Sequence, residues 1–216
     1  MADNYIPALA YRWLTPLYDP VVRWTTREST FKPALIEQSR LASSDRVLDL
    51  ACGTATLTLA AKRACPQADI TGLDGDPQIL ERARSKAARA GLDVRFTQAL
   101  SHEIPEKDGS FDVVMSSLFF HHLGRDAKLA TFREIRRILH PGGWLHVADW
   151  GKASNPLMRV LFFGVQLLDG FKTTNDNVAG LLPDFMRQSG FAEVAQTRSF
   201  ATPLGTIALY AARKPA

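Results

Sequence analysis

Three residues in the first half of the chain have the types and spacing of a nucleotide-binding turn. Asp49 lies within a short apolar run, Gly53 follows that run, and Asp74 ends a second apolar run. A glycine allows the backbone to approach a ligand closely, and the helix that follows offers free backbone N–H groups. A carboxylate at the end of the second strand can accept hydrogen bonds from both hydroxyls of a ribose. These residues therefore predict a nucleotide-like ligand at the turn.

The elements that must position these residues alternate between strand-like and helix-like stretches from residue 46 onward. This order is typical of βαβ units, in which parallel strands form a sheet with helices on both faces. Strands are expected at residues 46–50, 69–73, 94–98, 111–117, 144–149, 193–200 and 205–212, and helices from the end of the loop 51–54 to residue 64 and at residues 77–90, 125–139, 156–169 and 176–189. The last two strands, joined by a short turn, predict an antiparallel pair at one edge. The expected fold class is α/β: a doubly wound, Rossmann-like, seven-stranded and mostly parallel sheet with an antiparallel edge strand.

Length and composition fit one compact domain. A chain of 216 residues, 46% hydrophobic and 22% charged, is typical of a globular α/β domain. The 26 basic residues outnumber the 22 acidic residues, but the acids are interspersed among them, which argues against a nucleic-acid partner. Cys52 and Cys65 do not have metal-ligand spacing, so we expect no metal and a reducing, cytoplasmic location.

Export and membrane insertion are not expected. The first residues lack the basic and apolar regions of a secretory leader. The longest apolar run, residues 157–168, is interrupted by polar residues and is too short to cross a bilayer. We therefore expect no transmembrane segment.

Five segments resemble, in the same order, the successive motifs of class I SAM-dependent methyltransferases. They are residues 47–56 (VLDLACGTAT), 72–80 (GLDGDPQIL), 110–117 (SFDVVMSS), 121–122 (HH) and 137–143 (RILHPGG). The resemblance covers about residues 45–150 and extends to the small single-domain group that includes the ubiquinone and menaquinone C-methyltransferases. It implies S-adenosylmethionine (SAM) as the cofactor and methyl transfer as the activity.

The resemblance also implies a role for each matching position. The methionine part of SAM would be held by Asp49, Ala51, Cys52, Gly53 and Thr54, the ribose by Asp74, the adenine by Gly75, Ile79, Leu100 and Ser101, and the sulfonium side by Ser117. Tyr18, in an aromatic-rich segment near the amino terminus, is a further candidate for cofactor binding.

The chain departs from the family pattern at three of these positions. Two usual glycines are Ala51 and Ala55, and an acid often found before Ser101 is Leu100. The missing acid implies weaker adenine recognition or reliance on the backbone alone. A dinucleotide-dependent oxidoreductase is a less suitable assignment, because the turn lacks the third glycine of G-x-G-x-x-G and such enzymes do not need Asp49.

Two adjacent histidines are the candidates for acid–base chemistry. His121 and His122 follow the fourth expected strand, where the crevice at the carboxyl ends of the strands opens. Methyl transfer mostly requires that the nucleophile is positioned and water excluded, so a base is optional. A phenol or an enolisable carbon would need a proton removed, whereas a neutral amine or a thiolate would not. Because adjacent side chains cannot face the same way, at most one of the two is expected to reach a substrate. His121 is the candidate catalytic residue, with a packing or capping role as the alternative.

Two further regions are expected to shape the acceptor site. Residues 1–44 are predicted to form a helical cap rich in aromatic residues, ahead of a SAM-binding domain at residues 45–216. Its helices are expected to break at the prolines Pro16, Pro20 and Pro33. The helix at residues 155–171 is apolar around most of its circumference, which suits a lining for a lipophilic molecule, a core helix or a homodimer contact.

The expected function is methyl transfer from SAM to a small, lipophilic acceptor. Two alternatives stay open on the sequence. One is a SAM-binding protein without catalysis, which the altered turn permits. The other is a scaffold that binds a partner through the apolar helix.

Overall fold

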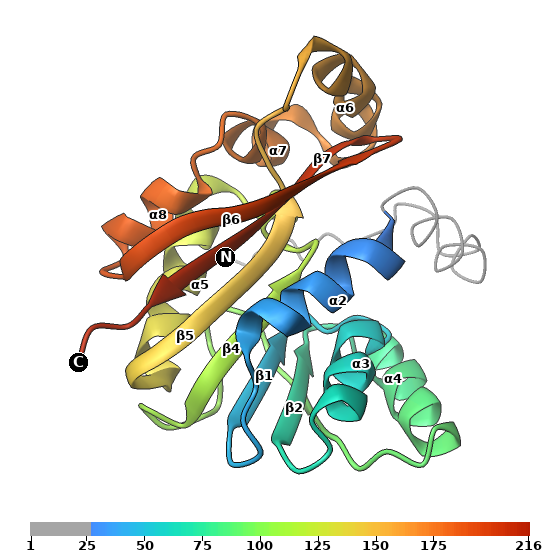
Figure 1. The fold of residues 1–216 in the computed structure, drawn as a ribbon, viewed down its shortest axis with the longest axis vertical. Coiled ribbons are helices and arrows are strands. Elements are labelled where there is room, and N and C mark those ends of the chain that lie inside the picture. Colours follow the sequence, from blue (N-terminus) through green and yellow to red (C-terminus); the bar gives the residue numbers. More distant parts are fainter. Residues whose placement is uncertain (1–26) are drawn as a thin grey trace.

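A computed structural model describes residues 27–216 of the chain. Seven strands form one sheet in the order β3-β2-β1-β4-β5-β7-β6 (Figure 1). The strands are β1 (Arg46–Leu50), β2 (Asp69–Asp74), β3 (Arg95–Gln98), β4 (Phe111–Ser117), β5 (Leu139–Trp150), β6 (Ala192–Thr202) and β7 (Gly205–Arg213). The first five run parallel, and β7 runs antiparallel between β5 and β6. This topology confirms the expected doubly wound, mostly parallel sheet.

The central strand β1 is buried on both faces because helices cover the sheet from each side. Four of its five residues, Val47 to Leu50, are buried. A parallel strand flanked by helices must be apolar along its length, which is the pattern that its sequence shows. The only charged side chain among these four buried residues is Asp49.

One face of the sheet carries α2 (Glu28–Ser39), α3 (Thr56–Ala64) and α4 (Pro77–Arg89) (Figure 1). Phe31 and Leu35 of α2 are completely buried in the same cluster as Val47. The expected break at Pro33 is therefore wrong, since the helix continues through this proline. Burial of the two large side chains beside it offsets the backbone hydrogen bond that a proline cannot make.

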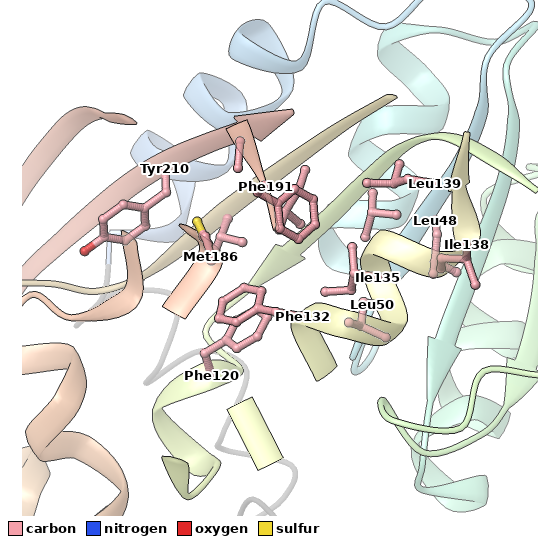
Figure 2. Close-up of a cluster of buried hydrophobic side chains, with 14 of the residues drawn as sticks. Leu48, Leu50, Phe120, Phe132, Ile135, Ile138, Leu139, Met186, Phe191 and Tyr210 are labelled. Atoms are coloured by element: carbon pink, nitrogen blue, oxygen red, sulfur yellow. The ribbon is translucent and has the colours of Figure 1, made fainter. Parts of the chain in front are cut away.

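The opposite face carries α5 (Arg125–Ile138), α8 (Leu182–Gln188) and the short 3-10 helix η2 (Phe120–His122). Their apolar side chains meet those of the strands in the cluster shown in Figure 2. Within it the rings of Phe120 and Phe132 stack with centroids 4.3 Å apart. This contact fixes η2, and hence the chain that leaves β4, against α5.

Two boundaries after β4 differ from the expectations. The helix expected at residues 176–189 is two helices, α7 (Phe171–Val178) and α8, because Gly180 takes a φ of +77° and ends the first. The strand expected from residue 144 starts at Leu139, which pairs with Phe111 ahead of an irregularity in the register. Pairing with a neighbouring strand thus extends β5 through a segment whose glycines and proline favour a loop.

The insertion between β5 and the last two strands contains α6 (Pro156–Asp169) and α7 (Figure 1). No helix within residues 27–216 is long and apolar enough to span a bilayer. The predicted cap of residues 1–44 lies outside the described residues up to position 26, so its role stays a prediction. Its described part, α2, packs on the sheet.

Phe132→Ala should destabilise the protein because Phe132 is completely buried and stacked on Phe120. Removing a buried aromatic ring leaves a cavity and costs about 3–5 kcal/mol in the free energy of unfolding. Urea denaturation measures this, with Leu157→Ala as the control, since Leu157 is 63% exposed. Equal denaturation midpoints for the two variants would contradict the packing described for this face.

Candidate functional site

The carboxyl ends of the parallel strands bring the predicted site residues to one edge of the sheet. Leu50, the last residue of β1, pairs with Leu73 on one side and Ser116 on the other. The loops that leave β1, β2 and β4 therefore start side by side. Two backbone hydrogen bonds hold these loops to the neighbouring strands. Cys52 N, after β1, donates to Leu73 O of β2 at 2.9 Å, and Leu118 N, after β4, donates to Ala148 O of β5 at 2.8 Å.

The turn after β1 has an unusual backbone. Ala51, Gly53 and Ala55 all take left-handed conformations, with φ values of +56°, +54° and +62°. The two alanines thus occupy positions that favour glycine, which explains why glycine is usual there. A Cβ built on Gly53 would meet nothing within 4 Å, so open space lies next to this backbone. Within residues 27–216, no side chain caps α3, which starts directly after the turn.

Asp49 is the buried charge of this site. It is 1% exposed, and the hydroxyl of Thr58 on α3 donates to its Oδ2 at 2.6 Å. Its Oδ1 is buried and has no hydrogen-bond partner among the described residues. Burial raises the pKa of Asp49 to about 6, although the Thr58 hydrogen bond and the charge of Lys32 oppose the rise. A buried carboxylate oxygen without a donor is costly, which favours a ligand that supplies one.

Asp74 joins the loops that follow β1 and β2. Its Oδ2 accepts from the backbone N–H of Gly53 at 2.9 Å, and its Oδ1 accepts from that of Asp76 at 3.0 Å. Burial raises the pKa of Asp74, against the effect of these two hydrogen bonds. Each carboxylate oxygen has two lone pairs, so both can still accept from a ligand hydroxyl.

The start of α4 is fixed by the signal that the sequence shows. The side chain of Asp76 accepts from the N–H groups of Gln78 and Ile79, and Pro77 fills the first turn. An N-cap followed by proline is a strong helix start. Gly75 and Ile79, both half-buried, are thereby held beside Asp74.

The remaining predicted residues line the neighbouring strand ends. Leu100, after β3, is 41% exposed, and Ala99 N bonds to Asp74 O at 3.2 Å. The hydroxyl of Ser101 pairs with that of Thr131 on α5 at 2.8 Å, so only its backbone is suited to the predicted adenine contact. Ser117 is half-buried at the end of β4. Tyr18 lies outside the described residues.

Cys52 is buried, and its Sγ lies 3.7 Å from Gly53 O. Thr54 is half-buried in the same turn. Among the described residues, no three His, Cys, Asp or Glu side chains form a group that could hold a metal. The site is therefore built from backbone and carboxylates.

The structure adds one residue that the sequence analysis missed. Asp149, at the end of β5, is completely buried, and its Oδ1 lies 2.7 Å from Nδ1 of His121. The rule that singled out Asp74, an acid at the carboxyl end of a parallel strand, also applies to Asp149. Only the fold, however, brings it next to His121, 28 positions away in the chain.

The comparisons with known proteins agree with this geometry. A family model described as a methyltransferase domain matches residues 47–143, the segment from β1 to the start of β5. A demethylmenaquinone methyltransferase of Thermus thermophilus is 40% identical over 105 residues, which are 49% of this chain and 47% of that protein. These findings support the resemblance to class I SAM-dependent methyltransferases over residues 47–143. The resemblance stated from the five motifs is thus confirmed.

Two further relatives define how far the similarity extends. The ubiquinone/menaquinone biosynthesis C-methyltransferase UbiE of Bdellovibrio bacteriovorus is 31% identical over 132 residues, which are 61% of this chain and 55% of that protein. The chain thus spans about half the length of these two relatives. The solved apo structure of the SAM-dependent methyltransferase SibL superposes with a TM-score of 0.75 at 23% identity. The superposition covers 96% of this chain and 60% of SibL. Because only 23% of the residues are identical, it shows that the two proteins share a fold and nothing more.

The residues at these strand ends fit SAM, the methyl donor of the proteins that the chain resembles. The Oδ1 of Asp49, which has no hydrogen-bond partner within residues 27–216, can accept from a cationic or hydroxyl group. Open space at Gly53 leaves room for a ligand against the backbone. The amino end of α3, positive by its dipole, faces the same turn and suits a carboxylate. Asp74 provides acceptors for ribose hydroxyls.

Asp49→Asn should stabilise the cofactor-free protein at neutral pH. Because the pKa of Asp49 is raised in the folded state, its ionisation opposes folding, and this cost appears as pH rises from about 4 to above 6. The pKa difference of about two corresponds to about 3 kcal/mol in the free energy of unfolding. The variant should therefore gain on the wild type by that amount between pH 4 and pH 7.5, as measured by urea denaturation.

Asp69→Asn is the matched control, since Asp69 is an exposed acid on the neighbouring strand β2. Its effect should not change with pH over this range by more than about 0.5 kcal/mol. A pH-independent difference between Asp49→Asn and the wild type would show that Asp49 is not a strained buried charge.

Proposed function

We propose that this protein transfers the methyl group of SAM to a small, lipophilic acceptor with a hydroxylated ring. The observation that carries the cofactor part is the buried Oδ1 of Asp49, to which no group in the described part of the chain donates, beside the open turn at Gly53. A folded protein rarely leaves a buried carboxylate oxygen without a donor unless a ligand provides it. The motifs from residue 47 to residue 143 and the relatives' names support the same activity.

The chain's own groups would divide the cofactor among them. In this proposal Asp49 and the turn 51–54 hold the methionine part, and Asp74 holds the ribose. The adenine lies against Gly75, Ile79, Leu100 and Ser101, and Ser117 faces the sulfonium. SAM supplies a methyl carbon activated by a positive sulfur. The protein's contribution is then to hold an acceptor in line with that carbon and to exclude water.

The acceptor class is inferred from the relatives and from α6. The two relatives named above are methyltransferases of quinone compounds, which are ring-bearing and lipophilic. Phe162 and Val165 of α6 are buried against the sheet. The opposite side of the helix exposes Leu157, Val160, Phe163 and Leu167. An apolar surface on both sides of the insertion suits an acceptor of low polarity.

A second function is favoured by the same exposed side of α6. A row of exposed apolar residues at helical spacing can also bind a partner or a second copy of the chain. A partner-binding protein that holds SAM without catalysis would keep the cofactor site and release no product.

Both cysteines are free, which agrees with the proposed cytoplasmic location.

Isothermal titration calorimetry with SAM tests the cofactor assignment. The wild type should bind, and Asp74→Ala should weaken binding by about 10- to 100-fold, the loss expected for hydrogen bonds to a charged acceptor. Asp69→Ala, an exposed acid at the start of the same strand, should leave the affinity unchanged. Absence of SAM binding, or equal binding by Asp74→Ala, would refute the cofactor site.

Release of S-adenosylhomocysteine then separates an enzyme from a non-catalytic binder. The wild type is incubated with SAM and a panel of quinols, phenols and lipids, and the product is quantified by mass spectrometry. We expect release with at least one hydroxylated ring. SAM binding without release on the whole panel would instead support the partner-binding function.

A further inference from the structure

A cavity of about 620 Å³ lies in the insertion after β5, between the end of that strand, the start of α6 and the end of α7. Figure 1 shows both helices beyond the end of β5. None of the described residues assigned to SAM lines this cavity. Sites for small organic molecules have volumes of about 300–1,000 Å³, so the cavity has room for such a molecule.

Two cationic side chains line the cavity, and none of the described lining side chains is acidic. Lys152 follows the end of β5, Arg159 lies in the first turn of α6, and both are exposed. Within residues 27–216, the ammonium group of Lys152 makes no hydrogen bond or ion pair. Two positive charges that share one cavity repel each other, so an anion between them is favourable.

The guanidinium of Arg159 is held by a buried amide. Its Nη1 donates to Oε1 of Gln166 at 2.7 Å, and Gln166 is completely buried. Nε2 of Gln166 in turn donates to Oδ1 of Asn175 at 2.8 Å. Because an arginine can only donate, the oxygen of Gln166 must face it and the nitrogen must face Asn175. The NH2 group of Asn175 is thereby turned away and has no partner in the described part of the chain.

The second amide of the lining, Asn155, is oriented in the same sense. As the N-cap of α6 its Oδ1 accepts from the N–H of Met158 at 2.9 Å, which leaves its NH2 group to a ligand. All the side-chain groups that the two amides and the two cations leave to a ligand are therefore donors. A carboxylate or a phosphate, which only accepts, matches this set. The amino end of α6 also favours negative charge.

The walls of the cavity are fixed by close contacts. Nδ2 of Asn177, a completely buried residue of α7, donates to Trp150 O at the end of β5 at 3.2 Å. Gly180 takes a φ of +77°, and a Cβ built on it would lie 3.3 Å from the Cβ of Lys152. A glycine here lets the end of α7 lie against the stem of this lysine. The cavity is thus part of the folded insertion.

We propose that this cavity binds the carboxylate or phosphate group of a small organic molecule. Lys152 and Arg159 are its cationic contacts, and Gln166 is the positioning residue of Arg159. Pro156 and Val178, which also line the cavity, suit an apolar part of the same molecule. A single inorganic ion would leave most of the volume unfilled. The proposal goes beyond the proposed function, because it needs neither SAM nor methyl transfer.

Calorimetry with naphthoate and with naphthyl phosphate tests the site, and neutral naphthamide is the control ligand. At least one anion should bind to the wild type with a dissociation constant below about 1 mM, and naphthamide at least about 10-fold more weakly. Lys152→Gln and Arg159→Gln should each weaken binding of the anion by about 10-fold, the effect of losing one charged hydrogen bond. Lys107→Gln and Arg82→Gln remove exposed cations elsewhere and should have no effect. Whichever anion binds more tightly identifies the group that the site prefers.

Two further measurements separate a formed site from general attraction to a basic protein. Gln166→Met keeps every charge but frees the guanidinium of Arg159, so it should weaken binding of the anion by about 3- to 10-fold. General attraction would be unchanged by this variant. In the wild type, naphthoate should shift the backbone amide NMR signals of Ala153, Val178 and Ala179, which line the cavity.

The inference is overturned if neither anion binds, if naphthamide binds as tightly as the anions, or if Lys152→Gln and Arg159→Gln both bind like the wild type. It is also overturned if the NMR shifts lie outside the insertion. Because Lys152 and Arg159 are exposed, their variants should fold even if Gln166→Met does not. Failure of the proposed function looks different, since the protein would then bind the anion but would not bind SAM or release S-adenosylhomocysteine.

Discussion

The parallel pairing of β1 with β2 and β4 is the constraint on which the rest of the site depends. Because Leu50 lies opposite both Leu73 and Ser116, the three strands end at the same level. The turn at Gly53, the acid at Asp74 and the segment after Ser117 are thereby gathered from distant parts of the chain. A change of register by one residue would separate them, and it would also turn Asp49 to the opposite face of the sheet, away from Thr58.

Two buried carboxylates at this edge are treated in opposite ways by their surroundings. Asp49 faces α3, and one of its oxygens has no partner in the part of the chain that the structure describes; burial raises its pKa to about 6. Asp149 lies on the other face with backbone amides and His121 around it, and its pKa is lowered. The first arrangement costs stability until a ligand compensates it, and the second orients a ring. The contrast is consistent with a binding role for one and a positioning role for the other.

The insertion after β5 is where this chain is least like a plain doubly wound sheet. Its helix α6 buries Phe162 on the sheet and leaves Leu157 and Leu167 exposed. Helix α7 then contacts η2, so the insertion reaches the histidine-bearing turn. This arrangement brings the insertion, whose helix α6 exposes apolar side chains, next to the turn that follows β4.

The sequence by itself determined the order of strands and helices, the cofactor turn and the acid at Asp74, because these depend on local patterns of apolar residues, glycine and caps. It also located His121 as a candidate. Only the tertiary structure decided that α2 continues through Pro33, that residues 176–189 divide between two helices, and that β5 begins at Leu139. It alone brought Asp149 to His121. Those features depend on packing and pairing between segments far apart in the chain, which no local pattern encodes.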